Sequence, residues 1–134
     1  MNKSARNQVY FYSILTASII WLIILPKPLR NYAPIIFIIP TFPFFMFNYY
    51  SKLIEFSNML KTIRPDLFNK YVVDYGYAFK GEIVNIGLAN RNNDFENLEN
   101  MELREKYLLS KQSIKLGLIS FLIFPILGIT TIYL

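Results

Sequence analysis

The sequence has neither cysteine nor histidine among its 134 residues. Without them the chain can form no disulfide, and it has no thiol nucleophile, no zinc ligand of the usual kind and no imidazole for acid–base catalysis. It also lacks the glycine-rich loop that holds phosphates and the short motifs of zinc proteases and serine hydrolases. We therefore predict that the protein is not an enzyme and has no cofactor, no metal site and no catalytic residue.

Charged side chains are missing from three long stretches, residues 9–25, 34–50 and 116–134. Each stretch is close to the roughly 20 apolar residues that a helix needs to cross a bilayer. The pattern predicts three transmembrane helices, at about 9–25, 34–50 and 114–134. Because no charged residue lies deep within them, the helices are poor candidates for a proton pump or a coupled transporter.

The first two stretches each admit an alternative interpretation. Residues 9–25 follow a basic head, as in a signal peptide, but no cleavage pattern of small residues comes after them, so we favour an uncleaved span. The second stretch contains Pro40 and Pro43, which remove backbone donors and predict a kink. A re-entrant loop is the alternative there.

A polar segment, residues 51–113, separates the second and third spans. From residue 51 to residue 115 there are ten Lys or Arg against nine Asp or Glu, so four of the five net positive charges come from elsewhere. The excess flanks the first span, at Lys3, Arg6, Lys27 and Arg30. Basic residues beside spans set topology or meet lipid head groups, so we predict no nucleic-acid partner.

Hydrophobic periodicity predicts that helices continue from the spans into the polar segment. One apolar stripe extends the second helix until Pro65 ends it, and a short helical turn follows. Residues 74–93 have the composition of a loop with room for a brief strand, and Asp94 is the expected N-cap of a last helix that begins near Phe95. The stripe consists of Leu53, Phe56, Leu60 and Ile63.

The predicted fold class is an all-α membrane protein with three transmembrane helices and a cytoplasmic antiparallel helical hairpin between spans two and three. Residues 1–134 form a single membrane domain. Basic residues at the inner ends of spans two and three place residues 51–113 in the cytoplasm of a bacterial cell, at its plasma (inner) membrane. The N-terminus is then cytoplasmic and the C-terminus outside, although Lys27 and Arg30 in the outer connection oppose that orientation.

Three sets of residues are candidate sites or contacts. Arg64 and Glu105 lie on facing stripes of the hairpin and are predicted to form an ion pair, with two solvated side chains as the alternative. Ser113 and Gly117 form a small-x-x-x-small pattern that favours close helix approach, within the molecule or between copies. The candidate partner-binding residues are Leu67, Phe68 and Tyr71.

Acidic residues give the only pattern that suggests a metal. Four glutamates recur at a spacing of three on the predicted last helix, which is typical of a solvated helix far more often than of a carboxylate site. We therefore keep the prediction of no metal. The four are Glu96, Glu99, Glu102 and Glu105.

The run LKTIRPDLFNKYVVDYGYAF, residues 60–79, resembles the segment after the first span in the universal stress protein B family. The matching positions are Leu60, Pro65, Leu67 and Phe68, then Gly76 and Phe79, and a charged helix that enters a final span. The resemblance implies a stress-linked or accessory membrane protein without known catalytic residues. Its partners would be the lipid bilayer and a membrane protein or a second copy. In build alone the chain is also similar to bacteriocin immunity proteins, which is the alternative function.

Overall fold

The computed structural model describes residues 2–74, 82–85, 95 and 98–134. The chain forms two compact units, the first made of residues 1–48 and 112–134 and the second of residues 49–111. Helices α2 and α5 contribute to both units. In chain order the elements are α1 (Lys3–Ile24), η1 (Leu29–Tyr32), α2 (Ala33–Ile63), α3 (Pro65–Tyr71), β1 (Val72–Asp74), β2 (Glu82–Val84) and α5 (Met101–Tyr133).

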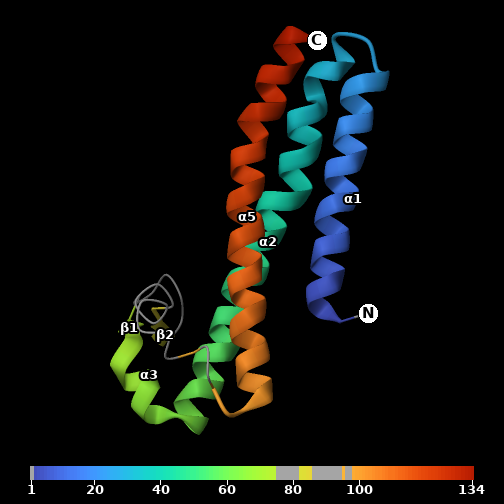
Figure 1. Ribbon diagram of the computed structural model, residues 1–134. Coiled ribbons are helices and arrows are strands. Elements are labelled where there is room, and N and C mark those ends of the chain that lie inside the picture. The colour runs from blue at the N-terminus through green and yellow to red at the C-terminus, as the bar shows by residue number, and fades with distance from the viewer. Residues whose placement is uncertain (1, 75–81, 86–94, 96–97) are drawn as a thin grey trace. The chain divides into compact units, whose positions relative to one another are not determined.

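Three helices in the described part of the chain are long and apolar enough to cross a membrane. They are α1, the run of η1 and α2 from Leu29 to Ile63, and α5. In the first unit, α1 lies beside the first part of α2 and the last part of α5 (Figure 1). Its core is aromatic, since the ring of Phe11 meets Phe37 at 6.0 Å and Phe45 at 6.1 Å.

Helix α2 passes through Pro40 and Pro43 without interruption. Polar side chains bond to backbone carbonyls at this point: the Thr41 hydroxyl donates to the Phe37 carbonyl at 2.6 Å, and the Tyr10 hydroxyl donates to the Pro40 carbonyl at 2.6 Å. Neighbouring helices and hydroxyl side chains are the usual means by which apolar helices tolerate proline. The segment is therefore one continuous helix.

Helices α2 and α5 approach closely within the first unit. A Cβ atom added at Gly117 would lie 3.2 Å from the sulfur of Met46 and 3.6 Å from the Cβ atom of Phe45. One turn away, the side-chain amide of Asn48 donates to the Ser113 hydroxyl at 2.6 Å. The close approach predicted from Ser113 and Gly117 thus occurs inside the molecule.

Two side chains, Trp21 and Arg30, form hydrogen bonds with backbone carbonyls at the connection between α1 and α2. The Trp21 indole donates to the Leu29 carbonyl at 2.8 Å. Arg30 donates to the Leu25 carbonyl at 3.2 Å and to the Leu134 carbonyl at 3.0 Å, and Figure 1 shows the C-terminus beside this connection. Because α1 and α5 both end here, the guanidinium lies at the negative ends of two helix dipoles.

The second unit packs around a group of aromatic rings. Phe95 meets Phe56 at 5.1 Å, Tyr71 at 5.4 Å and Tyr107 at 5.6 Å between ring centroids. The antiparallel strands β1 and β2 complete the unit, with Val72 opposite Val84. The Val84 amide donates to the hydroxyl of Ser57 on α2 at 3.1 Å, and both residues are buried.

The start of the last helix differs from the prediction. Helix α5 begins at Met101, and the Asn100 side chain accepts from the Leu103 amide at 3.0 Å, which is an N-cap contact. Phe95 lies in a turn before the helix and is buried, while the expected cap Asp94 is outside the described residues. The aromatic run Tyr75 to Phe79, where a brief strand was possible, is also outside them, and the described strands lie on either side of it, at 72–74 and 82–84.

Candidate functional site

The predicted partner-binding residues lie on α3. Phe68 is 3% exposed and Tyr71 is 4% exposed, and both belong to the aromatic core of the second unit, with Leu67 packed partly against it. Lys61 and Lys70 cover the two rings, at 5.5 Å from Phe68 and 5.2 Å from Tyr71. Helix α3 turns its apolar face inward and leaves little of Phe68 or Tyr71 exposed, and a binding role for these residues stays a prediction.

The predicted ion pair between Arg64 and Glu105 is replaced by a local one. The Arg64 guanidinium donates to both carboxylate oxygens of Asp66, at 3.2 and 3.1 Å, and Glu105 is exposed on α5. This pairing lowers the pKa of Asp66 and raises the pKa of Arg64. The reason is backbone geometry: Arg64 precedes a proline and leaves the helical region, with φ −133° and ψ 72°, so its side chain no longer follows the stripe of α2.

An ion pair that the sequence did not indicate joins α2 to α5. The Glu55 carboxylate accepts from Lys106 at 2.9 Å and from Lys52 at 3.3 Å. The hydrogen bond from Lys106 is the main reason that the pKa of Glu55 is lowered, and Lys52 adds to it. The residues lie 51 positions apart, so the Glu55–Lys106 contact was not visible in the periodicity of either helix.

The four glutamates considered as metal ligands do not share one helix. Glu102 and Glu105 are exposed on α5, Glu99 precedes the helix, and Glu96 is outside the described residues. Within the described part of the chain no group of three acidic residues is placed to hold a metal ion. A small hollow of about 310 Å³ beside Glu99 is lined by apolar and polar side chains in equal number, Ile63, Leu98 and Leu103 with Arg64, Glu99 and Asn100.

A polar network joins the start of α1 to α5 in the first unit. The Gln112 side chain donates to the carbonyl and to the hydroxyl of Ser4, at 3.0 and 2.9 Å, and its oxygen accepts from Asn7 at 3.3 Å. Asn7 is buried. All three side chains are neutral and carry both donors and acceptors, so they form these hydrogen bonds without a charged group. Amides at the edges of apolar stretches are the sequence signal that could have located it.

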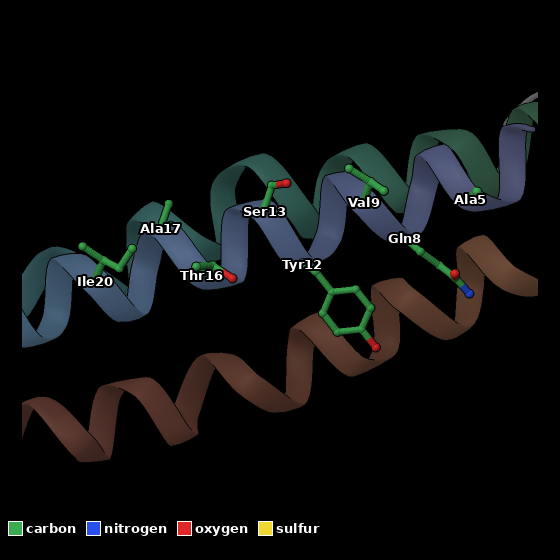
Figure 2. A pocket seen from close by; sticks show the side chains of 8 residues that line it. All are labelled: Ala5, Gln8, Val9, Tyr12, Ser13, Thr16, Ala17 and Ile20. Atoms are coloured by element: carbon green, nitrogen blue, oxygen red, sulfur yellow. The ribbon is translucent and has the colours of Figure 1, made fainter. Parts of the chain in front are cut away.

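A shallow groove on α1 runs from Ala5 to Ile20. In Figure 2, Gln8 and Tyr12 project to one side of the helix, and Ser13 and Ala17 project to the other. The side chains along the groove are mostly small and uncharged. Helix α1 alone lines it, and no group there is suited to catalysis.

Comparison of the chain with models of known protein families, with curated proteins and with solved structures finds no match. The candidate functions therefore depend on the geometry described above.

Proposed function

We propose that the protein is a multi-pass membrane protein of the bacterial plasma membrane that acts by binding, as an accessory or stress-linked component, and not by catalysis. One observation carries the membrane part of this proposal. Around its aromatic core the first unit exposes many large apolar side chains, and it buries several hydroxyl groups, a combination that is unusual for a protein folded in water. Phe47 is 79% exposed and Ile132 is 71% exposed, whereas Ser18, Thr41 and Ser120 are fully buried.

Most of the buried hydroxyl groups in this unit donate to carbonyls of their own helices. Ser18 donates to the Ile14 carbonyl at 2.9 Å, and Ser120 donates to the Leu116 carbonyl at 2.8 Å. Among the described residues no buried side-chain donor or acceptor lacks a partner. A helix surrounded by hydrocarbon has no water to meet such groups, so their complete pairing supports a bilayer location.

The number of Lys and Arg residues supports an orientation with the second unit in the cytoplasm. The second unit contains nine of them, whereas the α1–α2 connection contains two, Lys27 and Arg30. Of the two cations in the α1–α2 connection, Arg30 is bound to backbone carbonyls and has a packing role, which reduces its weight as a topology signal. The N-terminus would then be cytoplasmic and the C-terminus outside.

The binding role rests on the second unit, which has an aromatic core of its own and a balanced charged surface. The resemblance of residues 60–79 to the universal stress protein B family supports the same role. A partner would meet the exposed charged faces of this unit, since Phe68 and Tyr71 are used internally.

Single-cysteine labelling tests the orientation, because the natural chain has no cysteine. Asn31, in the α1–α2 connection, and Asn58, on the second-unit part of α2, are both exposed. In intact cells a membrane-impermeant maleimide should label Asn31→Cys, whereas Asn58→Cys should react only after permeabilisation. The opposite pattern would reverse the orientation, and a chain that leaves the membrane fraction in alkaline carbonate would refute the membrane proposal.

Exchange of the second unit tests the binding role. Cross-linking in cells with a tag in the second unit should recover a specific partner. A chimera that keeps the three spans but carries a foreign polar segment should lose that partner and its function. Retained function in the chimera would instead favour the immunity alternative, in which the spans meet a toxin.

A further inference from the structure

We propose that the groove on α1 holds one anionic phospholipid, with an acyl chain along the helix and the phosphate beside Lys3 and Arg6. The inference rests on the proposed membrane location. The groove runs from Ala5 to Ile20, which at 1.5 Å per residue is about 22 Å. One leaflet contributes about half of a hydrocarbon core roughly 30 Å thick. An acyl chain that starts at the basic end therefore has room to lie along the groove.

The side chains of the groove leave space for such a chain. Ala5, Ser13 and Ala17 are too short to fill the surface between the larger Tyr12 and Ile20. Exposed positions on α5 are different, since Phe121 and Leu122 cover that helix with bulky side chains. The face of α1 is thus the part of the first unit where a flexible apolar chain gains new contacts.

Charge decides which lipid the groove favours. Arg6 lies three residues before Val9 and so borders the groove side of α1, and Lys3 lies one turn earlier, at the start of the helix. Both are exposed, and neither forms an ion pair with any described residue. The first unit has no acidic residue that could neutralise these two cations. A lipid phosphate can do so, and it does so best in a head group that carries no positive charge of its own.

The same charges disfavour a second copy of the chain in the groove. Copies inserted in one orientation would pack α1 against α1 in parallel and bring Lys3 and Arg6 close to their equivalents. No carboxylate of this unit is present to neutralise them. Like charges at one height of an interface oppose association, whereas an anionic head group removes the repulsion.

Native mass spectrometry of the full chain tests the proposal. The protein is reconstituted in vesicles of equal phosphatidylglycerol and phosphatidylcholine, recovered by flotation and released gently. One phosphatidylglycerol should remain bound per chain, in several-fold excess over phosphatidylcholine. Lys3→Gln and Arg6→Gln should each reduce its retention roughly fivefold. Lys27→Gln removes the same charge at the other end of α1 and should change nothing.

A second pair of variants tests the groove itself. Ser13→Leu with Ala17→Leu fills the groove and should abolish retention of either lipid, whereas Gly128→Leu, a small-to-large change in open space on α5, should not. Equal retention of the two lipids, or no effect of the cation variants, would overturn the proposal. A dimer that carries no lipid would overturn it in favour of a second copy. A chain that does not float with the vesicles would refute the membrane location instead.

Discussion

Substitution of Gly117 by leucine should destabilise the first unit, because this glycine lets α5 approach α2. A Cβ atom at this position would already lie 3.2 Å from the Met46 sulfur and 3.6 Å from the Phe45 Cβ atom. Leucine adds three further carbons, and Phe45 is fully buried, so the space can come only from displacement of side chains or of the helix. Forced overpacking of this kind costs about 1–3 kcal/mol.

A graded series makes the test sharper. Gly117→Ala should be tolerated within about 1 kcal/mol, because the atom in closest contact belongs to the flexible side chain of Met46. Met46→Ala should recover part of the loss in the Gly117→Leu background, since it removes the first obstacle. Such a recovery is non-additivity between residues in contact.

The matched control lies eleven residues further along the same helix. Nothing lies within 4 Å of a Cβ atom added at Gly128, so Gly128→Leu changes the same residue type without a clash. Unfolding of each variant in detergent micelles, followed by helical circular dichroism, gives the comparison. If Gly117→Leu is no more destabilising than Gly128→Leu, the packing of α5 on α2 described above is wrong.

Three further predictions concern single contacts. Arg30→Gln should lower the free energy of unfolding by about 1–2 kcal/mol through loss of its bonds to two helix ends, and Lys27→Gln, which removes an exposed cation, is the control. Phe95→Ala should cost about 3–5 kcal/mol, because the ring meets three others in the core, and a loss below 1 kcal/mol would contradict that packing. The pKa of Glu55 is lowered from its ordinary value of 4.5. The carboxylate therefore adds to the free energy of unfolding above that pH, and this stabilisation is lost as the pH falls below it. The Glu55 side chain is 43% exposed, so the loss should stay below about 1 kcal/mol, and Glu55→Gln should remove this part of the acid dependence measured by denaturant titration.

The parts of the fold that were predicted correctly depend on patterns that lie within a short stretch of the sequence. Charge-free stretches of the right length correspond to the three apolar helices, and α2 ends at Ile63, two residues before Pro65 and close to the predicted end. The pattern of Ser113 and Gly117 predicted a close helix approach because small side chains have one geometric consequence wherever a neighbour is present. None of these predictions required knowledge of distant contacts.

The errors arose where two local signals were equal and tertiary packing decided between them. Asp94 and Asn100 are both good N-cap residues, and α5 begins after Asn100. A start at Asp94 would have made Phe95 part of the helix, whereas the structure uses it as the centre of an aromatic core. Phe68 posed a similar choice, because an apolar face on a short helix can meet a partner or its own core.

The Arg64 error was avoidable from the sequence. A residue before proline is driven away from the helical region, so a stripe extended through Arg64 places its side chain wrongly. Asp66, two residues later, was then the nearest available carboxylate. The cation that does reach across to another helix is Lys106, which meets Glu55, and only the register between two distant helices brings these residues together.

The polar contacts differ in kind between the two units. In the first unit the contacts between side chains of different helices are neutral, as in the bond from Asn48 to Ser113 or the bond between Asn7 and Gln112, whereas in the second unit Glu55 and Lys106 form an ion pair. An ion pair surrounded by hydrocarbon must overcome a desolvation penalty that water largely removes. On the proposal that the first unit lies in a bilayer, neutral groups are the ones that can join its helices without that penalty. The cations of that unit then belong at its ends, where head groups and backbone carbonyls can meet them, and Lys3, Arg6 and Arg30 are found there.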